Sequence, residues 1–233
     1  MKYIQLFILL FIILLSCTDS KSFEIDGTVE NNLLDGKYIY LQQMEGNKLI
    51  TFDSALVKNT KFKFKGHIIE PQFSEINYGQ NDTLNFSPAI FVLHEGKMEA
   101  SIDSFSYVRG GVVNNNLAEY YAQSYYYDQK LNYLKYQLNH DDNLNDSLLV
   151  AFRDWEQLYE REKISYALQF IEMNNNNLGG VLVFLQNISY FSREEIRNIL
   201  FYSGPIFRDN KDVKILEEYL EKTDTINVVP VQK

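Results

Sequence analysis

The chain has 233 residues, a formal net charge of −9 and 15% aromatic residues. The acidic balance argues against a nucleic-acid-binding protein and against a basic membrane-binding surface, because both depend on clustered Lys and Arg. Its apolar content of 45% is that of a chain that folds around a core, which excludes a disordered protein.

The N-terminus has the pattern of an export signal. Lys2 precedes an apolar run over residues 6–15, and about ten apolar residues are too few to cross a bilayer. The run ends in Leu14-Leu15-Ser16-Cys17, which resembles the lipobox of bacterial lipoproteins. The resemblance implies a signal peptide over residues 1–16 and a lipid on Cys17. An ordinary secretory signal with an incidental cysteine is the alternative.

Lipidation of Cys17 has two consequences. A polar tether over residues 17–22 would hold the protein at the outer (or inner) membrane, facing the periplasm or the cell surface. Cys17 is also the only cysteine of the chain. A lipid on its sulfur leaves no thiol for a disulfide or for thiol–disulfide exchange.

Residues 23–110 have the periodicity of β-strands. In residues 61–65 two Phe alternate with three Lys, as in a strand with one face in a core and the other in water. Similar short runs, separated by turn signals, predict seven or eight strands at residues 23–29, 38–41, 49–57, 61–65, 74–78, 89–93, 98–102 and 106–109. We predict a small antiparallel β-sandwich or barrel.

The period changes after Gly110-Gly111. Apolar residues recur at alternating spacings of three and four from Leu117 to Leu138, which predicts a helix that Asn116 caps. Further helices are expected at residues 147–173, 178–189, 192–203 and 213–220. The first of them would bury Leu148 and Trp155, and the third is opened by a Ser192/Glu195 capping box.

The fold class is therefore α+β, with a β domain followed by an all-helical domain. We expect a β domain over residues 23–110 that folds independently of a helical domain over residues 117–222. Residues 111–116 would be the junction, open to proteolysis. Residues 223–233 are predicted to be a non-helical tail.

A set of motifs in the first half resembles a known domain. The motifs are Phe23-x-Ile25-x-Gly27, Tyr38-x-Tyr40-Leu41, Asp53-Ser54-Ala55-x-Val57, Phe62-x-Phe64-x-Gly66, Pro71 and Glu95-Gly96. In this order they resemble a domain of unknown function found at the N-terminus of many Bacteroidetes-type lipoproteins. In that family a thioredoxin-like domain with a Cys-x-x-Cys dithiol usually follows a helical segment. This sequence contains no Cys-x-x-Cys, so the resemblance carries over no redox activity.

Few side chains suggest a chemical site. His67, His94 and His140 lie in separate elements, without a second ligand at metal-binding spacing, so we expect no metal site. No catalytic constellation and no cofactor-binding motif appears. Thr83 and Thr225, each preceded by Asp, resemble the O-glycosylation acceptors of Bacteroidetes-type exported proteins.

Five tyrosines crowd one predicted helix, at positions 120, 121, 125, 126 and 127. They cannot all face one core, so some pack against the β domain and others lie at a surface, where they suit a partner or a glycan.

We therefore expect a non-enzymatic, lipid-anchored protein of the cell envelope that binds a partner protein or a ligand. The rival hypothesis is a truncated or accessory component of a thiol–disulfide oxidoreductase system, acting with a separate thioredoxin-like partner. A third is a hydrolase or glycan-binding enzyme. A neighbouring gene for a Cys-x-x-Cys domain would favour the second hypothesis.

Overall fold

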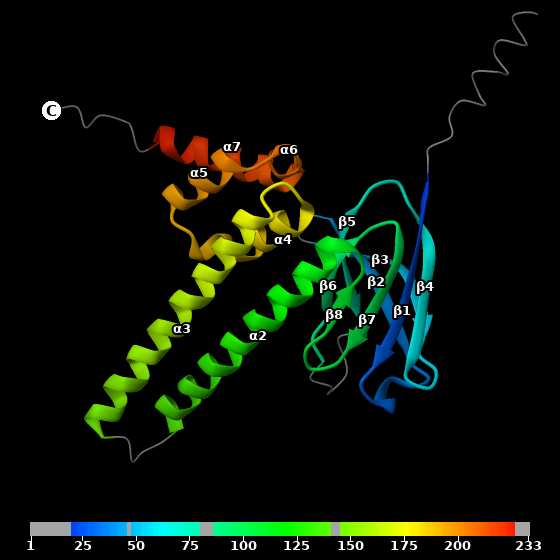
Figure 1. Ribbon diagram of the computed structural model, residues 1–233, viewed down its shortest axis with the longest axis horizontal. Helices are drawn as coiled ribbons and strands as arrows, with labels where there is room; N and C mark the ends of the chain where they lie inside the picture. Colours follow the sequence, from blue (N-terminus) through cyan, green and yellow to red (C-terminus); the bar gives the residue numbers. More distant parts are fainter. Residues whose placement is uncertain (1–19, 46–47, 80–85, 141–144, 227–233) are drawn as a thin grey trace, which may run out of the picture.

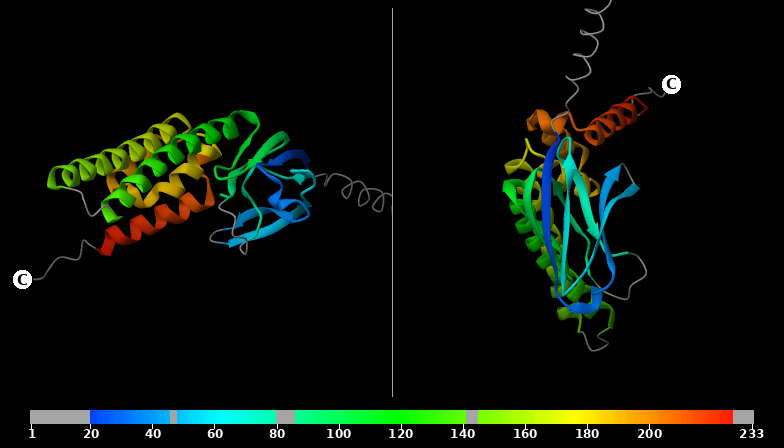
Figure 2. Two further views of the ribbon diagram at one scale, coloured as in Figure 1. Left: turned by 90° about the horizontal axis from the view of Figure 1, so that it is seen from below. Right: turned by 90° about the vertical axis from the view of Figure 1, so that its right-hand side faces the viewer.

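The computed structural model describes residues 20–45, 48–79, 86–140 and 145–226 (Figure 1). A β-rich part of two sheets comes first and a helical part follows, which confirms the predicted α+β class. The helices gather on one side of the sheets (Figure 2).

Eight strands form two four-stranded sheets. The first sheet has the order β4-β1-β7-β8 and the second has the order β3-β2-β5-β6. Their bounds are β1 (Lys21–Val29), β2 (Tyr38–Glu45), β3 (Lys48–Leu56), β4 (Lys61–Ile68), β5 (Gln72–Asn77), β6 (Ala89–Leu93), β7 (Gly96–Ile102) and β8 (Tyr107–Arg109), with a short 3₁₀ helix η1 (Asn32–Leu34) after β1.

One pairing differs from the predicted antiparallel arrangement. β1 pairs with β4 in antiparallel fashion but with β7 in parallel fashion, with Phe23 opposite Gly96. A parallel pair needs a long crossover connection. Here the strands of the second sheet lie between β1 and β7 in the sequence and are part of that connection. The alternation of side chains within a single strand does not show which strands pair in parallel.

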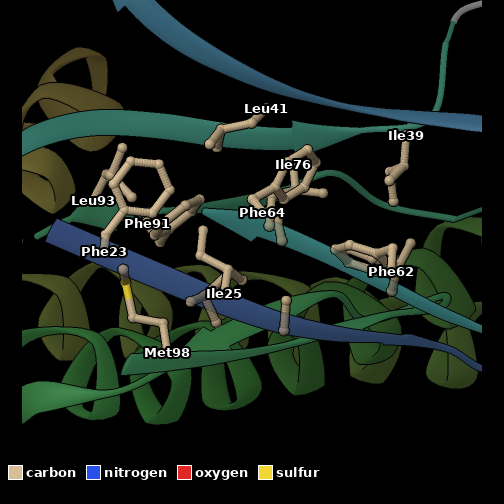
Figure 3. Close-up of a cluster of buried hydrophobic side chains, with 14 of the residues drawn as sticks. Phe23, Ile25, Ile39, Leu41, Phe62, Phe64, Ile76, Phe91, Leu93 and Met98 are labelled. Carbon is tan, nitrogen blue, oxygen red and sulfur yellow. The ribbon is translucent and has the colours of Figure 1, made fainter. Parts of the chain in front are cut away.

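The core of the sandwich lies between the two sheets (Figure 3). The predicted alternation in β4 is confirmed, because Phe62 and Phe64 are buried whereas the flanking lysines are exposed. The Phe62 ring covers Gly27 of β1, where an added Cβ would lie 2.0 Å from the ring. The core therefore requires glycine at position 27.

Six α-helices follow in the described ranges. They are α2 (Gly111–His140), α3 (Asp146–Met173), α4 (Leu178–Asn187), α5 (Arg193–Tyr202), α6 (Pro205–Arg208) and α7 (Lys211–Ile226), with a 3₁₀ turn η2 (Ile188–Tyr190) after α4. The capping box of Ser192 and Glu195 is present as predicted. Asn145 and Asn177 cap α3 and α4. α2 and α3 form a long antiparallel hairpin (Figure 1).

A second core joins the helices to the sandwich. Val92 of β6 is buried among helical side chains that include Tyr120 of α2 and Phe184 of α4. The sheet that contains β5 and β6 thus has one face in the sandwich core and part of its other face under α2 and α4.

Residues 111–116, predicted to be a junction between the β part and the helical part, form the first turns of α2. Asn114 is completely buried there. Its side-chain amide donates to the Val92 carbonyl (2.9 Å) and its Oδ1 accepts from the Val92 amide (3.0 Å), as a neighbouring strand would on the edge of β6. A Gly- and Asn-rich run resembles a linker when its tertiary partners are unknown. Asn116 is inside the helix rather than at its cap.

The ends of two helices also differ from prediction. α7 continues to Ile226, so residues 223–226 are helical rather than the start of a tail. β-branched residues lower helix propensity only slightly, and an existing helix propagates through them. In α3, Leu148 and Trp155 were expected to be buried but are exposed, because the far half of the hairpin extends beyond the other elements.

Candidate interaction surfaces

The predicted modification sites fall mostly outside the described residues. This holds for Cys17 and for Thr83. Thr225 lies in α7 rather than in a loop. None of the helices in the described ranges is long and apolar enough to cross a bilayer.

The histidines have local contacts. The ring nitrogens of His94 lie 2.6 Å from the Glu95 carbonyl and 2.8 Å from the Gly110 carbonyl, so this ring joins the β6–β7 turn to the start of α2. His140 stacks on Tyr136. Among residues 20–45, 48–79, 86–140 and 145–226, no group of three or more His, Cys, Asp or Glu side chains is placed to hold a metal ion.

The clustered tyrosines of α2 divide between core and surface. The Tyr120 hydroxyl accepts a hydrogen bond from the Asn187 side chain, and burial raises the pKa of Tyr120 to about 12. Tyr121 donates to the Gln186 side chain (3.0 Å), and burial likewise raises the pKa of Tyr121. Tyr125 packs against Phe105 beside β8, whereas Tyr126 is exposed. The tyrosines of this helix therefore lie both against other elements and at the surface.

The outer face of the sheet β4-β1-β7-β8 is a ladder of charges. Lys63 contacts Asp26 (2.6 Å) and Glu24 (2.8 Å), and Lys65 contacts Glu24 (2.8 Å). Hydrogen bonds from Lys63 and Lys65 lower the pKa of Glu24 to about 2, and hydrogen bonds to Asp26 and Glu24 raise the pKa of Lys63. These charges largely satisfy one another, as on an ordinary solvated sheet face.

Beside this ladder lies a hollow of about 720 Å³. Lys58, Lys61 and Arg109 line it together with the acids Asp26 and Glu99. Arg109 lies over the Tyr107 ring, 5.5 Å from its centre. The mixed charges on an exposed sheet do not select one class of ligand.

The far half of the α2–α3 hairpin carries a group of exposed aromatic and apolar side chains. We call this surface the aromatic flank, and it consists of Tyr126, Tyr133, Leu148, Trp155 and Leu158. Trp155, the only tryptophan of the chain, remains 49% exposed. Large exposed apolar groups that are contiguous mark interaction sites more often than isolated ones do.

Helical geometry places the aromatic flank on one side of the hairpin. Tyr133 is seven residues after Tyr126 on α2, and Trp155 is seven residues after Leu148 on α3, so each pair shares a helix face. Lys135 contacts both Glu156 and Glu160 (3.8 Å each), which brings the neighbouring Tyr133 level with Leu158.

The ion pairs of the hairpin lie on its other side. Lys135 contacts Glu156 and Glu160, and Lys163 contacts Asp128. At about 100° per residue, these charged positions lie on the opposite side of the α2–α3 contact from Tyr133 and Leu158. The aromatic flank is thus separated from the ion pairs, and periodicity alone missed it because Leu148 and Trp155 fit the buried stripe.

Comparison with known proteins identifies the first part of the chain only. Residues 23–117 match the family model of a domain of unknown function (DUF4369). The match confirms the resemblance to such a domain and includes the β-sandwich together with the first turns of α2. No curated protein and no solved structure matches the chain significantly.

Proposed function

We propose that this protein is a lipid-anchored, non-catalytic interaction module of the cell envelope, which presents the aromatic flank to a partner protein. The aromatic flank is the observation that carries the proposal. Tyr and Trp are enriched in protein interfaces, and Trp and Tyr are the most frequent hot-spot residues together with Arg.

The size of the aromatic flank suits one side of an interface. Its three aromatic rings and two leucines, each partly exposed, offer on the order of 400 Å² of apolar surface. One side of a standard interface buries about 800 Å² of surface. The centre of such an interface is apolar, and polar groups surround it. Such groups flank the hairpin, where Lys130 lies over the Tyr126 ring at 5.4 Å. A partner with an apolar groove that receives Trp155 fits this surface.

In this proposal the lipid anchor and the aromatic flank lie at different ends of the molecule. β1 begins at Lys21, four residues after Cys17. The loop end of the α2–α3 hairpin points away from the end of the sandwich at which β1 begins (Figure 1). A helix of 30 residues such as α2 is about 45 Å long. A lipid on Cys17 would therefore leave the aromatic flank free in the aqueous compartment.

We expect the protein to incorporate labelled palmitate at Cys17. The reason is the apolar run followed by Leu14-Leu15-Ser16-Cys17. The measurement compares wild type with Cys17→Ala in a bacterial host that processes lipoproteins. Label in wild type alone, together with loss of membrane association in the variant, supports the anchor. Equal label in both proteins contradicts it.

We expect a photo-crosslinking residue at Tyr133 or at Leu158 to capture the same partner in intact cells. These positions lie level with each other on the aromatic flank, so one partner would contact both. Val150 on α3, 58% exposed, and Tyr38 on β2, 55% exposed, are matched control positions outside the flank. The adduct should be absent from both controls and should be strongly reduced when Trp155→Ser is added to the flank positions.

The identity of the crosslinked protein separates the alternatives. One discrete adduct from both flank positions supports the proposal, and mass spectrometry then names the partner. A partner with a Cys-x-x-Cys domain would identify the chain as an accessory of a thiol–disulfide system. Adducts of equal yield from Val150 and Tyr38, or no adduct from the flank, would reject the aromatic flank as a binding surface.

A further inference from the structure

The end of the sandwich at which β1 begins carries an apolar hollow. Its volume is about 520 Å³, and it lies where the β4–β5 turn meets the first turns of α2, α4 and α6. Pro71, Val92, Val113 and Leu178 are among the side chains that line it. Lys21 at the start of β1 pairs with Ile68 of β4, the strand that leads into the β4–β5 turn. The start of β1 and the first turn of α2, which lines the hollow, lie at the same end of the molecule (Figure 1).

Three exposed aliphatic side chains belong to the hollow or to a segment that lines it. Val112 and Ile206 line its mouth, and Ile69 immediately precedes two of its lining residues, Glu70 and Pro71. Ile69 is 72% exposed, Val112 is 76% exposed and Ile206 is 49% exposed. They come from the β4–β5 turn, from the first turn of α2 and from α6. Three segments far apart in the sequence thus place a β-branched aliphatic residue at the same end.

The anchor proposed above restricts what this end can face. Lys21 is four positions after Cys17, and a chain of that length spans at most about 14 Å when fully extended. Acyl chains attached to Cys17 would be inside the bilayer. The first residue of β1 would then lie within that distance of the membrane surface, together with Ile68 of β4, which pairs with it and leads into the β4–β5 turn.

Charge at this end is balanced rather than basic. Lys21 lies 3.5 Å from Glu95. Lys97, at the start of β7, and Glu70, in the β4–β5 turn, carry opposite charges. A surface of this kind gains little from anionic lipids, whereas aliphatic side chains gain free energy in any bilayer interface.

We propose that this end of the molecule rests in the bilayer interface, with Ile69, Val112 and Ile206 inserted among the lipid headgroups and upper acyl chains. The inference rests on the proposed anchor at Cys17. It assigns the partner of this surface as a lipid bilayer, irrespective of headgroup charge. It also orients the molecule, with the aromatic flank directed away from the membrane.

Single-cysteine labelling tests the contact. Cys17 is the only cysteine and is acylated in the anchored protein, so Ile69→Cys, Val112→Cys and Ile206→Cys each introduce one free thiol. The full lipidated chain is labelled there with an environment-sensitive dye and reconstituted into phosphatidylcholine vesicles. We expect a blue shift of the dye emission and loss of fluorescence when the vesicles contain lipids with nitroxide-labelled acyl chains. Both effects should persist at high salt.

Two exposed aliphatic residues serve as controls. Leu33 in η1, 52% exposed, lies beyond the opposite end of β1, and Val150 lies near the tip of the hairpin. Labels at Leu33→Cys and Val150→Cys should show neither effect. If the labels at positions 69, 112 and 206 behave like these controls in vesicle-bound protein, the bilayer contact is rejected while the anchor stands. If the full chain does not float with the vesicles at all, the anchor itself is rejected, and the orientation with it.

Discussion

Asn114→Ala should lower the free energy of unfolding by about 3 kcal/mol. The variant removes both hydrogen bonds to Val92 and leaves a buried amide and a buried carbonyl at the edge of β6 without partners, each at a cost of about 1–3 kcal/mol. Urea denaturation followed by circular dichroism measures the change. Hydrogen exchange should show reduced protection in β6 and in α2 together, because Asn114 joins the two.

Asn132→Ala is the matched control for this variant. Asn132 lies on the same helix but is exposed, so its replacement should change the stability by no more than about 0.5 kcal/mol. The Asn114→Asp variant keeps the side-chain acceptor but loses the side-chain donor, so we expect this protein also to be less stable than wild type. An Asn114→Ala protein as stable as Asn132→Ala would mean that the sandwich and the helices are held together by Val92 and its apolar neighbours alone.

Gly180→Ala should destabilise the protein by about 2–3 kcal/mol, although Ala usually stabilises a helix by about 1 kcal/mol relative to Gly. Gly180 is buried in the first turn of α4. A Cβ at this position would lie 2.1 Å from the Asn174 carbonyl oxygen, which belongs to the backbone at the end of α3. Relief of this clash would require α3 and α4 to separate. The urea midpoint should therefore fall rather than rise.

The neighbouring glycine provides the control. A Cβ at Gly179 would meet the Asn177 side chain at 3.0 Å and the Val113 side chain at 3.1 Å. Side-chain atoms can shift by a few tenths of an ångström, so Gly179→Ala should change the stability by less than about 1 kcal/mol. A Gly180→Ala protein that is more stable than wild type would show that helix propensity outweighs the close approach of α4 to Asn174.

Much of the fold could be predicted because its signals are local. Eight strands and the helices after residue 110 were expected from periods of two and of three to four, since these periods follow directly from strand and helix geometry. The capping box at Ser192 and the boundary at Asn174–Asn177 were expected for the same reason, because a cap contacts only residues within its own helix turn.

The candidate site was less accessible to sequence reasoning. Leu148, Phe152 and Trp155 have the spacing of a buried stripe, and that spacing does not depend on whether another element covers the helix. Trp155 is exposed because, among the described residues, no further element covers the far half of the hairpin. The Ile69, Val112 and Ile206 group was missed because its members lie in turns or first helical turns that are far apart in the sequence.

The sequence by itself determined the types and order of the elements, the α+β class and the resemblance to a domain of unknown function. The tertiary structure alone decided which elements meet. Asn114 and Val92 are 22 residues apart, and no local pattern predicts that a side-chain amide will pair with the edge of a strand. The parallel β1–β7 pair and the exposure of the aromatic flank are likewise decided by tertiary structure. Each depends on contacts between distant segments, or on their absence, and these follow from the packing of the whole chain.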